Sequence, residues 1–134
     1  MLDAYIGVSQ GRRAALLAAS EPVPDPQSAR ALLDTGASCT CVDPSVLARL
    51  GIPSTGTTLV NSPTTGTSPQ TVNVYDVSIW IPGAIPPPFF LGTVAVAESQ
   101  LLQSQGFHIL LGRDILAYCM VHYSGPLNLV TVSY

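Results

Sequence analysis

The residues best suited to chemistry stand where an apolar run ends in an acid. The segment reads Ala31-Leu32-Leu33-Asp34-Thr35-Gly36-Ala37-Ser38. If the apolar run is a buried strand, the carboxylate of Asp34 lies at the rim of a core, where burial disfavours its charged form unless it has a partner. Asp-Thr-Gly alone also fits an ordinary turn in which Gly36 has a positive φ. The segment therefore predicts either a carboxylate held for acid–base chemistry or a simple turn.

A second segment, nearer the C-terminus, also runs from apolar residues into a glycine and an acid. It reads Ile109-Leu110-Leu111-Gly112-Arg113-Asp114-Ile115-Leu116. Together and in this order, the two segments resemble the motifs of retropepsin-like aspartic proteases, in their single-domain bacterial or cellular variety. The resemblance implies an all-β fold, a retropepsin-like barrel or sandwich with one or two short helices, active as a symmetric homodimer. It covers most of the chain in pattern, but only these two segments in sequence.

The resemblance also gives roles to single residues of the first segment and of the family's flap. Asp34 would be half of the catalytic dyad. Thr35 would hydrogen-bond across the two-fold axis to the partner's loop, and Gly36 would let the backbone approach the carboxylates and the substrate. The residues expected to bind substrate are Ala37, Ser38, Thr65 and Gly66.

In the second segment the resemblance implies structural roles. Gly112 would allow close packing against the active-site strand, and Arg113 would be structural. Retroviral enzymes often carry an acid two residues after the motif glycine that can pair with this arginine. Ser38 stands there in this sequence, so the partner of Arg113 is left open, and Asp43 is one candidate replacement. Asp114 would cap or brace the following helix; an alternative makes it a second catalytic acid within one monomer.

One motif implies a dimer because of the chemistry of peptide hydrolysis. Without a covalent intermediate, the reaction needs a base that activates a water and an acid that protonates the carbonyl or amine. In aspartic proteases two neighbouring carboxyl groups share one proton, because both cannot ionise cheaply. This chain has one Asp-Thr-Gly, so the second carboxylate would be Asp34 of another copy. The predicted function is an aspartic endopeptidase acting on peptides or proteins; the alternative is a catalytically silent module that binds peptides or dimerises.

Length and composition limit the other functions. The 134 residues are expected to form one domain, 1–134. Charged residues make up 10% of the chain, against roughly 25% in an average domain. This indicates either an apolar surface covered by a partner or a surface built mainly from Thr, Ser and Gln. A net charge of −3 with five basic residues does not suggest binding to nucleic acid. No apolar run is long enough to predict a membrane span, and no signal peptide is expected.

The cysteines are Cys39, Cys41 and Cys119. An odd number argues against a disulfide framework, and the separation of Cys39 from Cys41 gives poor disulfide geometry. The two histidines form no ligand spacing with them, so neither a metal nor another cofactor is expected. Small buried hydrophobic side chains are the preferred interpretation. Free thiols are consistent with a reducing, cytoplasmic location.

The N-terminal half is expected to contain strands and one short helix. Residues 3–9 and 29–34 read as strands. Arg13–Ala19 has helical propensity, but the family has a hairpin strand there, so a strand is expected. Asp43 is expected to cap a helix that ends at Gly51.

The C-terminal half is expected to be mostly hairpins. The stretch at about 57–81 predicts the hairpin that serves as the flap in retropepsins, with its tip near Pro63–Ser68. The proline-rich stretch Pro82–Pro88 predicts a stiff loop, and Phe89–Ala97 a strand. Residues 120–134 are expected to form a last hairpin.

Overall fold

The computed structural model describes residues 1–61 and 68–134, in which nine strands and four helical segments are formed. The strands are β1 (Leu2–Val8), β2 (Gln27–Leu33), β3 (Cys41–Val42), β4 (Gly56–Val60), β5 (Gln70–Ile81), β6 (Phe89–Glu98), β7 (Ile109–Leu111), β8 (Met120–Ser124) and β9 (Leu129–Ser133). The helices are α1 (Gln10–Ala18), α2 (Pro44–Leu50), α3 (Leu102–Gln105) and α4 (Arg113–Leu116). The fold was predicted to be all-β with one or two short helices. Strands do predominate, and four helical segments are formed in the described residues.

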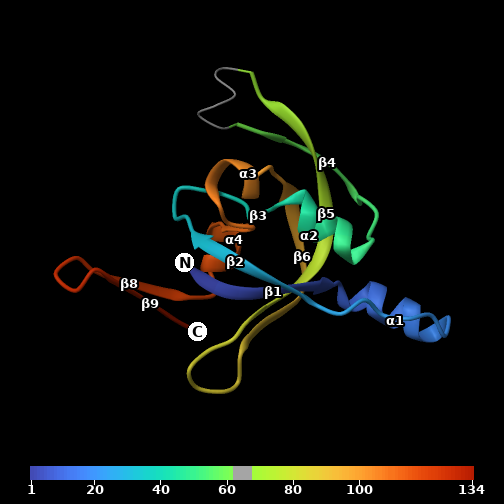
Figure 1. Ribbon diagram of the computed structural model, residues 1–134, viewed down its shortest axis with the longest axis horizontal. Helices are drawn as coiled ribbons and strands as arrows, with labels where there is room; N and C mark the ends of the chain where they lie inside the picture. Colours follow the sequence, from blue (N-terminus) through green and yellow to red (C-terminus); the bar gives the residue numbers. More distant parts are fainter. Residues whose placement is uncertain (62–67) are drawn as a thin grey trace.

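Six of the strands close into a barrel. Neighbouring strands follow the order β1-β2-β7-β3-β6-β5, and β5 pairs back with β1. Closure depends on β1, because its residues Leu2–Ile6 pair with β2 while Tyr5–Val8 pair with β5. Strand β4 is bonded to the other edge of β5 and extends the sheet beyond the barrel (Figure 1).

The core of the barrel follows from the alternation of side chains along each strand. Successive residues of a strand point to opposite faces, so every second residue faces inward. The fully buried set includes Ile6, Ile79, Ile109, Leu111 and Val96. These β-branched and leucine side chains come from four different strands, so the core joins segments that lie far apart in the sequence.

The segment Arg13–Ala19, expected to be a strand, belongs instead to helix α1. The side chain of Ser9 caps this helix by accepting a hydrogen bond from the backbone N–H of Arg12 at 3.2 Å. Ala, Leu and Arg are among the best helix formers, and the helix buries none of its residues. Because α1 projects from the barrel (Figure 1), pairing with a barrel strand does not oppose the helical propensity of this segment. The helix begins at Gln10, directly after this cap.

The second helix is formed as the sequence predicts. Asp43 caps α2 by accepting from the N–H of Ser45 at 2.9 Å, and Gly51 ends the helix with φ 62°. The other oxygen of Asp43, Oδ2, accepts from the N–H groups of Leu101 and Leu102 at 2.9 and 2.8 Å. The buried carboxylate thus joins the start of α2 to the start of α3.

Two hairpins and a long loop leave the barrel. The β4–β5 hairpin matches the predicted flap region, although its expected tip lies largely outside the described residues. Pro82–Pro88 forms the loop between β5 and β6, and β8 pairs with β9 in a separate two-stranded sheet (Figure 1). None of the helices in the described residues is long and apolar enough to span a membrane.

The contacts of Asp43 predict how it contributes to stability. Burial by itself would raise the pKa of Asp43, but the backbone N–H groups of Leu102, Ser45 and Leu101 outweigh that effect and lower it. Asp43→Ala would leave these donors without their acceptor, so we expect the free energy of unfolding to fall by roughly 2–3 kcal/mol. Urea unfolding at neutral pH measures this change, and an unchanged midpoint would contradict it.

The pH dependence of the same site has a defined sign. A carboxyl group with a lowered pKa in the folded state contributes stability above its unfolded pKa, and this contribution is lost as the pH falls through the folded value. We therefore expect Asp43→Asn, which cannot titrate, to lose less stability than the wild type between neutral pH and acid below about 4. Equal losses in both proteins would contradict this assignment.

Candidate functional site

The two segments singled out in the sequence meet at one edge of the barrel. Strand β2 runs parallel to β7, with Leu33 opposite Leu111. Both strands therefore end at the same level, and the pairing continues for one more residue, because the N–H of Asp34 donates to the carbonyl of Leu111 at 3.0 Å. Residues almost eighty positions apart are thereby brought together, as the resemblance implied.

The loop after β2 holds the Asp34 carboxylate in a defined orientation. The N–H of Gly36 donates to Asp34 Oδ1 at 2.8 Å, and the N–H of Ala37 donates to the Asp34 carbonyl at 3.2 Å. A Cβ at position 36 would lie 3.1 Å from the same Oδ1, so a residue without a side chain suits this close approach. Asp34 is half-buried, while Thr35, Gly36 and Ser38 are exposed. Solvent and small molecules can therefore reach the carboxylate.

A buried threonine connects this loop to the second segment. Thr40 has no exposed surface. Its hydroxyl donates to Asp114 Oδ1 at 2.7 Å and accepts from the N–H of Gly112 at 3.1 Å, and its own N–H donates to Asp114 Oδ2 at 2.9 Å. Both carboxylate oxygens of Asp114 are thus used in holding the loop, and Oδ1 also accepts from the N–H of Ile115. Sequence reasoning missed Thr40; its only signal was a polar residue within a run of small apolar ones.

Gly112 lies against the backbone of the same loop. A Cβ at this position would lie 2.5 Å from the carbonyl carbon and oxygen of Cys39 and 3.0 Å from the nitrogen of Thr40. No side chain fits there unless the backbone moves. This is the close packing that the resemblance implied for Gly112.

Arg113 holds the loop through backbone carbonyls. Its Nη1 donates to the carbonyl of Thr35 at 2.9 Å, and its N–H donates to the carbonyl of Ala37 at 2.9 Å. The prediction that Asp43 replaces the missing acidic partner is wrong, because the oxygens of Asp43 accept from backbone N–H groups at the starts of α2 and α3. A carbonyl partner makes an acid at position 38 unnecessary.

Two of the three cysteines, Cys39 and Cys41, directly follow the Asp34 loop, and Cys119 follows α4. All three are free, with Cys41 buried and Cys39 and Cys119 half-buried. Burial, followed by the neighbouring Cys39, raises the pKa of Cys41 to about 12, so its thiol stays protonated at neutral pH. Within residues 1–61 and 68–134, no group of three or more His, Cys, Asp or Glu side chains could hold a metal ion.

The expected flap can be followed only in part. Strands β4 and β5 pair as far as Val60 and Gln70, and the hairpin extends away from the barrel at the top of Figure 1. Thr65 and Gly66, predicted to bind substrate, lie outside the described residues.

The contact at Gly112 predicts a selective loss of stability. In Gly112→Ala the new methyl group would displace the backbone of Cys39, so we expect the free energy of unfolding to fall by at least about 2 kcal/mol. Gly56→Ala is the matched control, because a Cβ at Gly56 meets nothing within 4 Å. Chemical denaturation of the three proteins measures the difference, and equal midpoints for both variants would contradict the tight packing.

Comparison with known proteins agrees with this geometry. A family model described as "Aspartyl protease" matches residues 24–115, which is more than half of the chain. The matched region contains the Asp34 loop, the β4–β5 hairpin and Gly112–Asp114. A search of curated protein sequences found no match. With the closed barrel, the family match shows that the chain belongs to the retropepsin-like aspartyl proteases.

Proposed function

We propose that this protein is a homodimeric aspartic endopeptidase, with Asp34 from each of two copies forming the catalytic dyad. The observation that carries the proposal is the Asp34 loop. Its carboxylate is accessible from solvent, oriented by Gly36, and fixed to the second segment through Thr40 and Arg113. A catalytic group must be held by a rigid surrounding structure if it is to meet a substrate in one geometry.

The proposed reaction divides acid and base roles between two identical carboxyl groups. The charged Asp34 takes a proton from a water, whose oxygen attacks the peptide carbonyl carbon. The protonated Asp34 of the other copy gives its proton to the carbonyl oxygen. As the tetrahedral intermediate collapses and the C–N bond breaks, the first Asp34 gives the proton it took from the water to the leaving amine nitrogen, and the other Asp34 takes a proton from a hydroxyl of the intermediate, which restores the starting state of the pair. Two carboxyl groups that share one proton supply both functions at once.

The second carboxylate is proposed to come from another copy because Asp114 is already engaged. Both oxygens of Asp114 accept hydrogen bonds from Thr40, which suits a structural role better than a reacting acid. Thr35 is exposed, and its hydroxyl makes no hydrogen bond within the described residues. It is therefore available to bond across the two-fold axis.

The remaining roles follow the same proposal. Gly36 lets the backbone approach the dyad, and Ala37 and Ser38 line the substrate groove. Thr65 and Gly66, in the flap, contact the substrate from the other side. The substrate is a peptide or protein, with apolar side chains expected around the cleaved bond. The proposed enzyme is a single domain that uses no cofactor and acts in the cytoplasm.

The second candidate function is a catalytically silent module that binds peptides or dimerises. The observation that favours it is the long proline-rich loop at Pro82–Pro88, which departs from the short connection usual in the family. The substitution Asp34→Asn distinguishes the two candidate functions, because peptide binding or dimerisation by a silent module does not need an acid at position 34.

Asp34→Asn is expected to abolish peptide cleavage. Removing the acid–base group should lower the cleavage rate by roughly 10³-fold or more. The cleavage rate is measured by incubating each protein with a proteome-derived peptide library between pH 3 and about 8 and identifying the products by mass spectrometry. Asp25→Asn, in an exposed loop, is the matched control. Equal cleavage by Asp34→Asn and wild type would contradict the proposal. Lack of cleavage by either would favour the silent module.

Mixing the proteins tests whether the active site is shared. If each active site needs Asp34 from both copies, about a ninefold excess of Asp34→Asn should reduce wild-type activity to about one tenth by random pairing of subunits. Saturating substrate ensures that the excess Asp34→Asn protein does not lower the rate simply by binding substrate. Denatured Asp34→Asn, which cannot pair with wild-type subunits, serves as the control. Activity that stays unchanged after subunit exchange would instead favour a monomer that uses Asp34 and Asp114.

A further inference from the structure

Three aromatic side chains form a row on the outer face of the barrel. Tyr5 on β1 lies opposite Trp80 on β5, and Trp80 lies opposite Phe90 on β6. Residues opposite one another on neighbouring strands share a face, and this face points outward, because the adjoining Ile6 and Ile79 are fully buried. Trp80 is 41% exposed and Phe90 52% exposed. These three side chains, the aromatic row, thus present a continuous aromatic surface across three strands.

The aromatic row offers apolar ring faces together with hydrogen-bond donors. The ring centroids of Tyr5 and Trp80 are 5.4 Å apart, with an angle of 37° between the ring planes. The indole N–H of Trp80 and the hydroxyl of Tyr5 can both donate hydrogen bonds. The row contains no acidic or basic side chain, and two residues along β1 the charges of Asp3 and Arg30 lie opposite each other. This surface therefore suits an uncharged ligand that has apolar rings and hydrogen-bond acceptors.

The spacing of the strands fits a polyproline II helix. Neighbouring strands lie roughly 4.8 Å apart, so the aromatic row spans roughly 10 Å from Tyr5 to Phe90. A polyproline II helix rises about 3.1 Å per residue with three residues per turn, which gives roughly 9 Å per turn. Prolines one turn apart can therefore contact the row together. Because such a helix has no internal hydrogen bonds, its carbonyl oxygens are free to accept from Trp80 and Tyr5.

The same outer face already contacts a proline of this chain. Gly7 follows Tyr5 by two residues on β1 and lies opposite Ser78, so its outward direction is that of the aromatic row. A Cβ at Gly7 would lie 3.8 Å from Cγ of Pro26, which is an ordinary van der Waals distance. A proline ring thus packs on the sheet directly beside the row.

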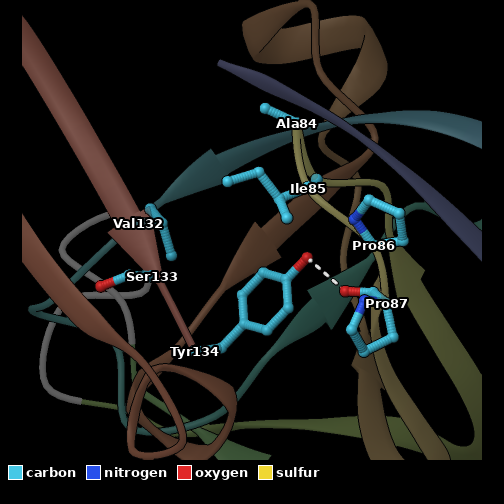
Figure 2. A pocket seen from close by; sticks show the side chains of 8 residues that line it. Ala84, Ile85, Pro86, Pro87, Val132, Ser133 and Tyr134 are labelled. Carbon is cyan, nitrogen blue, oxygen red and sulfur yellow. Dashed lines mark hydrogen bonds between the residues drawn. The ribbon is translucent and has the colours of Figure 1, made fainter.

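Elsewhere in the molecule a tyrosine binds a proline-rich segment by the same chemistry. In the loop between β5 and β6, the carbonyl of Pro87 accepts a hydrogen bond from the Tyr134 hydroxyl at 3.3 Å (Figure 2). The Tyr134 ring also lies 5.4 Å from the ring of Phe89. Phe89 and Phe90 point to opposite faces of β6, so this contact holds Pro87 on the side of the sheet away from the aromatic row. The row is therefore left open to another ligand.

We propose that the aromatic row is a binding site for a proline-rich peptide in the polyproline II conformation. The proline rings pack on the faces of Trp80 and Phe90, and the peptide carbonyl oxygens accept from the Trp80 indole N–H and the Tyr5 hydroxyl. Peptides of this kind bind aromatic surfaces at a low entropic cost, because their extended conformation is formed before binding. The site does not include Asp34, so the inference does not depend on the proposed protease activity.

Fluorescence tests the inference directly, because Trp80 is the only tryptophan in the chain. Octaproline should shift the Trp80 emission saturably, whereas a glycine–serine peptide of equal length should not. Phe90→Ala should raise the dissociation constant for octaproline at least about fivefold, whereas Phe90→Tyr, which keeps the ring, should stay within about twofold of the wild type. Tyr123→Ala removes an exposed aromatic ring from the separate β8–β9 sheet. It is the matched control and should bind octaproline as the wild type does.

A second variant guards against a Phe90→Ala protein that fails to fold, which urea unfolding would reveal. Tyr5→Phe keeps the ring and removes one hydrogen-bond donor, so it should weaken octaproline binding at least about threefold. Unchanged binding by these variants, no saturable shift in the wild type, or an equal shift with the glycine–serine peptide would overturn the inference. A shift caused by raising the protein concentration alone, or by a cello-oligosaccharide but not by octaproline, would assign the row to a second copy or to a carbohydrate and would overturn it as well.

Discussion

The parallel pairing of β2 with β7 is the contact on which the candidate site depends. It brings Leu33 opposite Leu111 and continues through the Asp34 N–H to the Leu111 carbonyl. Only with this register do Gly112, Arg113 and Asp114 reach the loop that follows β2. A parallel pair cannot be joined by a tight turn, so the site depends on the long stretch of chain that connects β2 to β7.

The site combines a rigid support with an accessible acid. Thr40 is buried and bonded to Asp114 and Gly112, whereas Asp34 itself remains half-buried. The buried polar atoms are mutually satisfied, which avoids the large cost of an unpaired polar group in the core. The rigid part of the site is thus separate from the part that meets solvent.

The elements outside the barrel follow different physical rules. Helix α1 buries none of its residues and takes the structure that its own sequence prefers. The β8–β9 hairpin exposes apolar side chains on a chain with few charges. Such a surface is unfavourable for an isolated molecule and favourable for one that associates.

Features that depend only on neighbouring residues could be predicted from the amino-acid sequence. The order of the two segments, the hairpin at about 57–81, the Asp43 cap and the proline-rich loop could all be recognised from local patterns. The same local information correctly favoured a helix at residues 13–19, and the prediction failed where an expected hairpin strand was preferred to propensity. Tertiary structure alone decided the partner of Arg113, the role of Thr40 and the crowding at Gly112. These depend on the register between strands far apart in the chain, and no short-range pattern specifies which carbonyl or hydroxyl that register brings within hydrogen-bonding distance.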